Sequence, residues 1–188
     1  MNKLQDLIDT LCPDGVEYEK LENLCNILDS KRKPIAKDKR KKGKYRYYGA
    51  NGIQDYIDNY IFDGTFILMG EDGSVINKDK SPVLHWVTGK IWVNNHAHIL
   101  EENKNMNLKF MYYYLQTVDV SGIVRGTPPK INQQNLKNIK IPLPPIEIQS
   151  EIVRILDNFT ELTAELTARK KQYEYYRDKL LTFKEKTK

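Results

Sequence analysis

The sequence predicts an α+β domain followed by one long helix, and two observations carry this prediction. Short runs of β-branched and aromatic residues, separated by Gly, Asn and Asp, fill residues 29–143. From Ile148 onward, apolar or aromatic side chains recur at alternating steps of four and three residues, and no Gly or Pro follows Pro145. We therefore expect a globular domain over residues 1–143 and a coiled-coil helix over residues 144–188.

The globular part should begin with a short amphipathic helix, because apolar residues at helical spacing lie on one face of residues 4–11. A Pro-Asp-Gly turn and a second apolar segment around residues 21–27 follow it. Asn107 is a suitable N-cap for a helix that carries Leu108, Met111 and Leu115 on one face, and a shorter helix should start at Asn132. The predicted strands are Tyr45–Tyr48, Thr65–Met69, Pro82–Val87 and Ile91–Val93.

Length and composition limit the protein class. The chain of 188 residues, 40% of them hydrophobic, has room for one domain and an appendage. No run of 18 apolar residues could span a membrane, and the first residues lack the pattern of a signal peptide. Cys12 and Cys25 form neither a disulfide framework nor a zinc site by their spacing. We expect a cytoplasmic protein without a membrane partner.

The long helix should need a helical partner. Its heptad pattern covers about 36 residues, or roughly 54 Å, and its large side chains would leave an apolar stripe in water. Folding back onto the preceding domain remains the alternative. The predicted dimer interface consists of Ile148, Ile152, Ile155, Phe159, Leu162, Leu166, Tyr173, Tyr176, Leu180 and Phe183, and Arg169 completes the heptad core.

The charge along this helix favours an antiparallel homodimer. Residues 147–165 have a net charge of −4, whereas residues 166–188 have a net charge of +5. Two antiparallel copies would therefore place acidic halves beside basic halves. The same asymmetry also suits the helix dipole, so that explanation stays open. An antiparallel pair would present two identical domains to inverted half-sites on DNA.

Positive charge is concentrated in residues 31–46. This segment holds ten Lys or Arg and one Asp, a net charge of +9, while the whole chain has +5. Lys and Arg neutralise phosphates, and the neighbouring Tyr residues and the Asn51-Gly52 turn add groups that bind bases or phosphate. A second candidate loop spans residues 125–130. A solvated basic loop is the alternative. The candidate DNA contacts are Lys31, Arg32, Lys33, Lys44, Tyr45, Arg46, Tyr47, Asn51, Arg125, Thr127 and Lys130.

The sequence gives little support for catalysis. His85, His96 and His98 have no nearby Cys or acidic residue in the sequence to complete a metal site, so we expect no metal. No P-loop or GxGxxG motif is present. A small metal-dependent nuclease with an oligomerising helix remains the alternative function. Its acids and lysines would be Asp63, Glu71 and Asp72 beside Lys78, or Glu102, Asn103 and Lys104.

Several motifs resemble the specificity subunits of type I restriction-modification systems. Residues 47–53, 55–56, 70–73 and 92–97 resemble their target-recognition domain. The stretch LKNIKIPLPP at 136–145, with Gln149, Ile152, Leu156 and RKKQYEYYRDKLLTF at 169–183, resembles their conserved-region helix. Full-length members carry two domains and two helices, whereas this chain has one of each. It therefore resembles a half-size form that dimerises.

The resemblance also implies partners and a division of labour. Methyltransferase (M) subunits would dock on the helices and bind S-adenosylmethionine, and a restriction (R) subunit could join them. This chain would then hold no cofactor and act as a non-catalytic reader of double-stranded DNA. The recognition residues vary widely in such families, so the resemblance implies neither the target sequence nor the spacer length.

Overall fold

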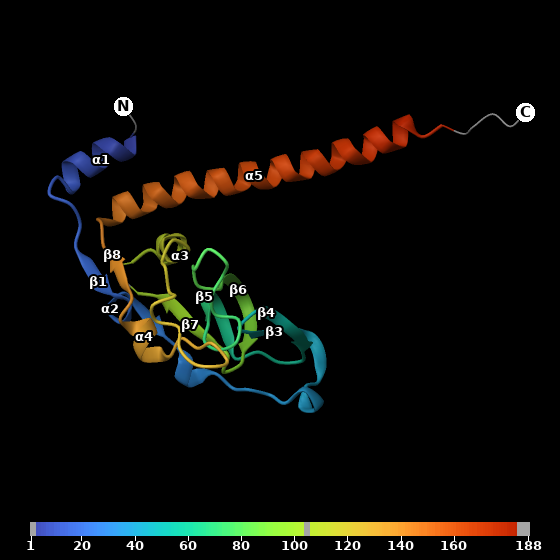
Figure 1. Ribbon diagram of the computed structural model, residues 1–188, viewed down its shortest axis with the longest axis horizontal. Coiled ribbons are helices and arrows are strands. Elements are labelled where there is room, and N and C mark those ends of the chain that lie inside the picture. Colours follow the sequence, from blue (N-terminus) through green and yellow to red (C-terminus); the bar gives the residue numbers. More distant parts are fainter. Residues whose placement is uncertain (1–2, 104–105, 184–188) are drawn as a thin grey trace, which may run out of the picture.

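The computed structural model describes residues 3–103 and 106–183. It consists of a globular part and one long helix, α5 (Ile146–Leu181), which leaves the globular part and extends past it (Figure 1). We call residues 3–145 the head and residues 157–181 the arm. The predicted α+β fold with a long C-terminal helix is confirmed.

The head contains a six-stranded sheet and a separate pair of short strands. The order in the large sheet is β2-β7-β5-β6-β3-β4, and only β3 and β6 pair in parallel. The strands are β2 (Cys25–Ile27), β3 (Lys42–Gly49), β4 (Gly52–Ile57), β5 (Phe62–Gly70), β6 (Leu84–Val93) and β7 (Ala97–Glu102). The antiparallel pair is β1 (Tyr18–Lys20) with β8 (Lys140–Pro142), which brings the two ends of the head together.

Strand β6 differs from the sequence prediction. Two strands were expected, at 82–87 and 91–93, but one strand runs from Leu84 to Val93. Gly89 has φ of +80° and pairs with Gly64 of β5, so the two strands bend together without ending. β6 therefore runs from one end of the sheet to the other as one strand.

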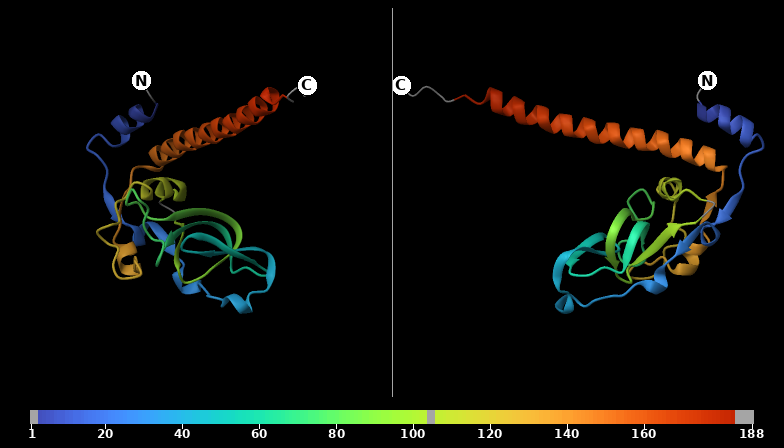
Figure 2. Two further views of the ribbon diagram at one scale, coloured as in Figure 1. Left: turned by 45° about the vertical axis from the view of Figure 1, so that its right-hand side comes forward. Right: turned by 180° about the vertical axis from the view of Figure 1, so that it is seen from behind.

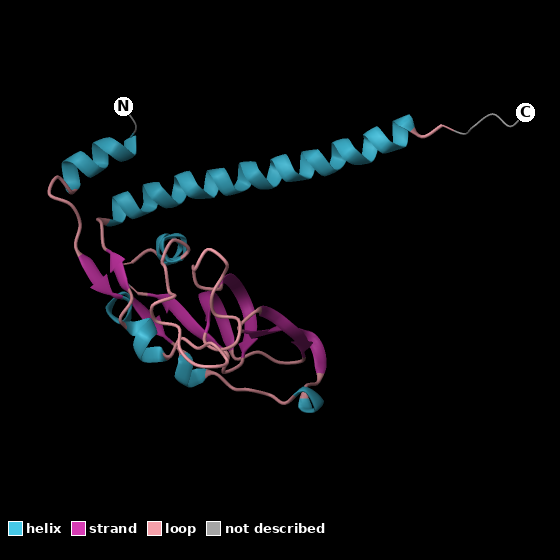
Figure 3. Ribbon diagram, in the orientation of Figure 1, coloured by secondary structure: helices cyan, strands magenta, loops and turns pink. Residues whose placement is uncertain are grey.

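The helices described in the head are short. They are α1 (Lys3–Leu11), α2 (Leu21–Leu24), α3 (Leu108–Leu115) and α4 (Gln133–Lys137), and two 3-10 turns are η1 (Asp29–Lys31) and η2 (Lys37–Lys39). Helices α2, α3 and α4 contribute side chains to the core on one face of the sheet, and α1 packs against α5 (Figures 1 and 3). Both predicted N-caps are confirmed. The Asn107 side chain accepts from the backbone N–H of Lys109 and Phe110, and Asn132 accepts from that of Asn135.

The second half of strand β5, from Phe66 onward, is buried on both faces and separates two cores. Ile67 and Met69 belong to the main core, which includes side chains of α2, α3 and α4. Phe66 and Leu68 point to the opposite face, into a smaller core between the curved strands. A strand buried on both faces explains the uninterrupted apolar run at 66–69.

The first turns of α5 pack against the head. Ile148 is 2% exposed, and Ile152 packs against the main core. The buried Gln149 amide accepts from the backbone N–H of Asn107 (2.8 Å) and donates to the carbonyl of Pro144 (2.8 Å). The prediction that Ile148 lies in a dimer interface is therefore wrong, because its own chain already buries it. Ile152 and Ile155 are partly covered in the same way.

The arm has the opposite character. Every residue from Asp157 to Leu181 is exposed, and α5 extends away from the head in all three views (Figures 1 and 2). Leu162 and Leu166 are 59% and 55% exposed. The start of the arm still contacts α3, because Asp157 accepts a hydrogen bond from the Tyr113 hydroxyl and lies 3.7 Å from the Lys109 amine. The apolar residues from Phe159 to Leu181 nevertheless stay largely exposed, so the alternative in which the helix buries its stripe on its own domain is wrong for the arm. Phe183 lies two residues beyond the last residue of α5, so it is not on the helix.

Within the described ranges, no helix has the length and apolar content needed to cross a membrane.

Candidate nucleic-acid interface

The basic segment of residues 31–46 is fixed to the outside of the sheet. The Trp92 indole N–H donates to the carbonyl of Lys33 (2.6 Å), and the backbone N–H of Ile35 donates to the Tyr47 hydroxyl (3.0 Å). The segment then enters β3, which lies between β4 and β6 in the sheet. These anchors hold the chain in a defined position without using its charged side chains.

The arginines and lysines of this segment have different surroundings. Arg32, with a side chain 12% exposed, pairs with Glu71 (2.5 Å) and donates to the carbonyl of Ala97 (2.8 Å). Arg40 lies 4.2 Å from the centre of the Tyr47 ring. The seven lysines are exposed, and they are Lys31, Lys33, Lys37, Lys39, Lys41, Lys42 and Lys44. The forked guanidinium groups fasten the segment, and the lysines remain in solvent.

Two predicted DNA contacts are therefore wrong. The Arg32 guanidinium is engaged by carboxylates inside the head, so it is not available to a phosphate. Tyr47 is 1% exposed, with its ring under Arg40 and its hydroxyl bound to the backbone of Ile35. The sequence pattern could not show that these two side chains turn inward while their neighbours face solvent.

A cluster of lysine and tyrosine side chains lies where β3, β5 and β6 meet. The rings of Tyr45 and Tyr60 are 5.0 Å apart, the Lys90 amine lies 4.7 Å from the Tyr60 ring, and the Lys44 amine lies 5.4 Å from the Tyr45 ring. A hydrogen bond with Tyr60 raises the pKa of Lys90, so its positive charge is retained. Tyr60 and Lys90 were not predicted because 15 and 45 residues separate them from Tyr45. We call these four residues the tyrosine–lysine cluster.

Arg46, the remaining basic residue of β3, lies beside this cluster. It donates to the carbonyl of Thr88, and its guanidinium is 5.7 Å from the Tyr48 ring. Arg46 is only partly buried, so part of its guanidinium still faces solvent. Its predicted role at DNA stays open.

A second group of polar residues forms one rim of the sheet. The carbonyl of Ala50, next to Asn51, lies 3.3 Å from Nε2 of His85. The buried Asn94 donates to the Gln54 amide (3.1 Å) and accepts from the backbone N–H of His96 (2.8 Å). These bonds fix the β3–β4 turn, in which Gly52 has φ of +93°. Asn51 is exposed at the tip of this turn.

The rim continues into the loop of residues 125–130. Nδ1 of His96 lies 2.5 Å from the Asp72 carboxylate, and Asp72 forms a β-bridge with Lys130. Two backbone hydrogen bonds between Arg125 and Lys130 close the loop. Arg125 and Thr127 are exposed, whereas the Lys130 amine lies 3.2 Å from Glu71. The structure thus brings the two predicted loops to connected positions.

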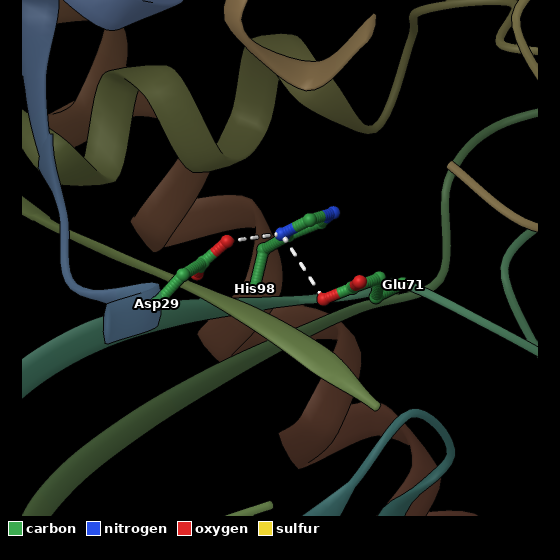
Figure 4. A group of neighbouring side chains, drawn as sticks. All are labelled: Asp29, Glu71 and His98. Atoms are coloured by element: carbon green, nitrogen blue, oxygen red, sulfur yellow. Dashed lines mark hydrogen bonds and ion pairs between the residues drawn. The ribbon is translucent and has the colours of Figure 1, made fainter. Parts of the chain in front are cut away.

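Beneath the rim lies a buried charge cluster of Asp29, Glu71 and His98 (Figure 4). Nδ1 of His98 is 2.6 Å from Asp29 and 3.6 Å from Glu71. Nε2 of His98 is 2.8 Å from the carbonyl of Ile131, which can only accept, so Nε2 carries a hydrogen. Burial alone would raise the pKa of Asp29, but the hydrogen bond and charge of His98 hold it below its usual range.

This cluster corrects one statement from the sequence. His98 does have acidic neighbours, but Asp29 and Glu71 come from distant parts of the chain. Arg32 lies 3.5 Å from Asp29, and both Arg32 and Lys130 pair with Glu71. These two cations neutralise the carboxylates and would repel a metal ion. The arrangement suits a charge network that joins η1, β7 and the end of β5.

The acids of the nuclease alternative do not gather in one place. Asp63 and Glu71 lie at opposite ends of β5, roughly 26 Å apart along the strand, and Asp63 faces Lys90 across the sheet. Glu71 belongs to the charge cluster, and Asp72 pairs with His96. Lys104, of the second proposed set, lies outside the described residues. Asp63 and Glu71 of the first proposed set are thus too far apart to bind one metal ion.

Comparisons with known proteins give one consistent result. Residues 13–173 match the family model described as type I restriction modification DNA specificity domain. A putative type I restriction enzyme specificity subunit of Haemophilus influenzae is 40% identical over 92% of this chain and 48% of its own length. A type I restriction enzyme specificity subunit of Escherichia coli is 39% identical over 70% of this chain and 40% of its own length.

A solved structure has the same fold. The S subunit of a type I restriction-modification system from M. genitalium superposes with a TM-score of 0.68 and 16% identity, over 98% of this chain and 50% of that one. The chain spans about half the length of the relatives that it matches. The resemblance recognised from the motifs is confirmed, and the chain belongs to the family of type I restriction-modification DNA specificity domains.

Proposed function

We propose that this chain supplies DNA sequence specificity to a type I restriction-modification methyltransferase or endonuclease complex. The observation that carries the proposal is the division of the basic segment, in which two arginines fasten the backbone and seven lysines stay exposed. A solvated loop needs no such anchoring, whereas a surface that must meet a rigid duplex does.

The proposed interface has two functions. The exposed lysines, together with Tyr45, Arg46 and the rest of the tyrosine–lysine cluster, contact phosphates and set affinity. Asn51, Arg125 and Thr127, held on the connected rim, contact base edges and set sequence preference. Lys130 has a smaller part, because its amine is shared with Glu71.

The arm supplies the second half of the proposal. Two copies pair through their arms in antiparallel orientation, so that two heads read two inverted half-sites. Methyltransferase subunits dock on the paired helices and carry S-adenosylmethionine, and a restriction subunit can join them. This chain itself is non-catalytic and acts in the cytoplasm, where its DNA lies.

Binding and methylation assays test the proposal. The purified chain should bind a labelled duplex of random sequence with an affinity that falls steeply with salt. When it is expressed with its methyltransferase subunit, modified bases should appear in one bipartite motif across the genome. A chain that bound no duplex, alone or with that subunit, would contradict the proposal.

Oligomeric state tests the pairing separately. Sedimentation at micromolar concentration should give twice the mass of one chain. Cleavage of plasmid by the purified chain with Mg²⁺, lost in an Asp72→Asn or Glu102→Gln variant, would instead favour the nuclease alternative.

A further inference from the structure

The exposed part of the heptad stripe limits how two arms can pair. Ile148 is buried by the head, and Ile152 and Ile155 are partly covered. The stripe that is free for a partner therefore begins at Phe159, which is 63% exposed, and continues to Leu180, which is 69% exposed. A second copy offers the same stripe, and this inference rests on the homodimer proposed above.

We infer that two copies of this chain pair in one particular antiparallel register. Leu162 of one copy faces Leu180 of the other, Leu166 faces Tyr176, and Arg169 faces Tyr173. Each heptad has two kinds of core position, and in an antiparallel pair each kind faces the other. The three stated pairs satisfy this rule. Any other register that satisfies it is shifted by a multiple of seven residues.

Arg169 distinguishes this register from the register that is shifted by one heptad toward the heads. It is the single charged residue among the core positions. In the proposed register its guanidinium lies against the ring of Tyr173 of the partner, where a cation and an aromatic face attract each other. A shift of one heptad toward the heads would place Arg169 against Leu166 of the partner, which offers no such contact. That shift would also push the partner helix onto Ile155, which the head already covers in part.

The charges that flank the stripe agree with this register. Glu165 of each copy faces Lys179 of the other, which gives two ion pairs across the interface. Within one arm Glu165 pairs with Arg169 (2.7 Å). Formation of the dimer would therefore replace Arg169 with Lys179 of the other copy as the partner of Glu165. The two copies of Lys170 meet near the two-fold axis at some cost. A shift of one heptad toward the heads gives neither the ion pairs nor this repulsion.

The register fixes the distance between the heads. The two copies of Ile146, where α5 begins, would lie about 75 Å apart along the helix axis. This separation is about two turns of DNA.

Cysteine cross-linking tests the register directly. The native Cys12 and Cys25 are buried, and burial raises the pKa of the Cys25 thiol to about 12, so both are poor competitors for oxidation. The Leu162→Cys, Leu180→Cys double variant should form covalent dimers under mild oxidation. The Leu162→Cys single variant should not, because antiparallel pairing places its two copies about 27 Å apart.

The possible outcomes test the proposed register separately from the homodimer itself. Dimers from the Leu162→Cys single variant would show parallel pairing and overturn the inference. Strong cross-linking of a Leu162→Cys, Tyr173→Cys variant, with none for the Leu162→Cys, Leu180→Cys variant, would show the shifted register and overturn it as well. A wild-type chain that sediments as a monomer would instead refute the homodimer itself.

A charge exchange provides a readout without cysteine. Glu165→Lys should weaken dimerisation, and adding Lys179→Glu in the same chain should restore it about tenfold. If the double variant were as weak as Glu165→Lys alone, the proposed contact between these residues would be wrong.

Discussion

The head and the arm satisfy opposite physical requirements. In the head, two apolar cores enclose β5, and within the described residues every buried side-chain nitrogen or oxygen has a hydrogen-bond partner. In the arm, apolar residues are 49–69% exposed, although the helix is continuous. Intrahelical pairs such as Glu165–Arg169 contribute only about 0.3–0.5 kcal/mol each. The comparison teaches that the head buries its apolar residues within its own chain, whereas the arm leaves its apolar stripe in solvent.

A charge on the heptad stripe should have the largest effect, because it acts on pairing of the arm and leaves the head unchanged. Leu166→Glu should abolish dimerisation while the head stays folded, because burying a carboxylate in place of a leucine costs at least about 3 kcal/mol per copy. Each dimer contains two copies, so the total of about 6 kcal/mol weakens association about 10,000-fold or more. Sedimentation and DNA binding should be measured together, and binding to the bipartite site should decrease more than binding to a single half-site.

Thr167→Glu is the matched control. It adds the same charge one residue away, on a face of the helix that points away from the stripe. We expect it to leave the dimer intact. Equal loss in both variants would mean that the stripe is not the interface, and it would remove the distinction between head and arm.

The charge cluster provides the largest expected effect on the head alone. Asp29→Ala should lower the free energy of unfolding by about 3–5 kcal/mol, because it removes the buried carboxylate that bonds with His98 and with the backbone N–H of Ile99. Urea denaturation measures this change. Dimerisation through the arm should survive wherever the head is still folded.

Asp63→Ala is the corresponding control, since Asp63 is exposed at the other end of β5. Its effect should stay within about 0.5 kcal/mol. If Asp29→Ala were equally mild, the cluster would contribute little to the stability of the head.

Local signals predicted much of this structure. Asn107 and Asn132 mark helix starts because a cap acts within three residues, and the stripe of α5 follows from a regular repeat. Short strands such as β1 and β8 were missed because three residues carry too weak a pattern. The contacts of His98 were missed for another reason. Asp29 lies 69 residues away, and only the folded sheet brings the two together.

The candidate site was predicted less completely than the fold. Charge density indicated the basic segment, but it could not separate Arg32, which faces inward, from Lys31 and Lys33, which face solvent. Tyr60 and Lys90 carried no signal of their own, because they reach the cluster from the β4–β5 loop and from β6.

The exposed lysines allow a smaller, graded test of the head. Lys37→Ala with Lys39→Ala should weaken binding to all duplexes and reduce the salt slope by about 0.9 for each lost phosphate contact. The fold should be unchanged, since both side chains are in solvent. Anisotropy titrations at several salt concentrations measure the slope.

Lys140→Ala with Lys171→Ala removes the same charge elsewhere on the chain. These residues lie on β8 and on the arm, away from the basic segment. An equal reduction of the slope in both double variants would mean that net charge, and not the basic segment, attracts DNA.

The smallest expected effect lies where the head meets α5. Hydrogen bonds from Arg154 and Lys3, which outweigh the effect of burial, lower the pKa of Glu151 from 4.5 to about 2. Lys3 belongs to α1, so its contact with Glu151 (2.9 Å) joins α1 to α5. Because the folded pKa is depressed, this stabilisation is present above pH 4.5 and is lost as the pH falls toward 2.

A carboxyl NMR titration can locate this effect. The Glu151 resonance should titrate near pH 2 in the wild type, and Arg154→Met should move the midpoint upward, because it removes the main hydrogen bond to the carboxylate. Glu151→Gln should remove this part of the pH dependence of α1 packing, while the arms remain paired. A wild-type midpoint near 4.5 would mean that Arg154 and Lys3 do not hold the carboxylate. In that case the ion pairs at the start of α5 would not join it to the head, and its charged side chains would resemble those of the solvated arm.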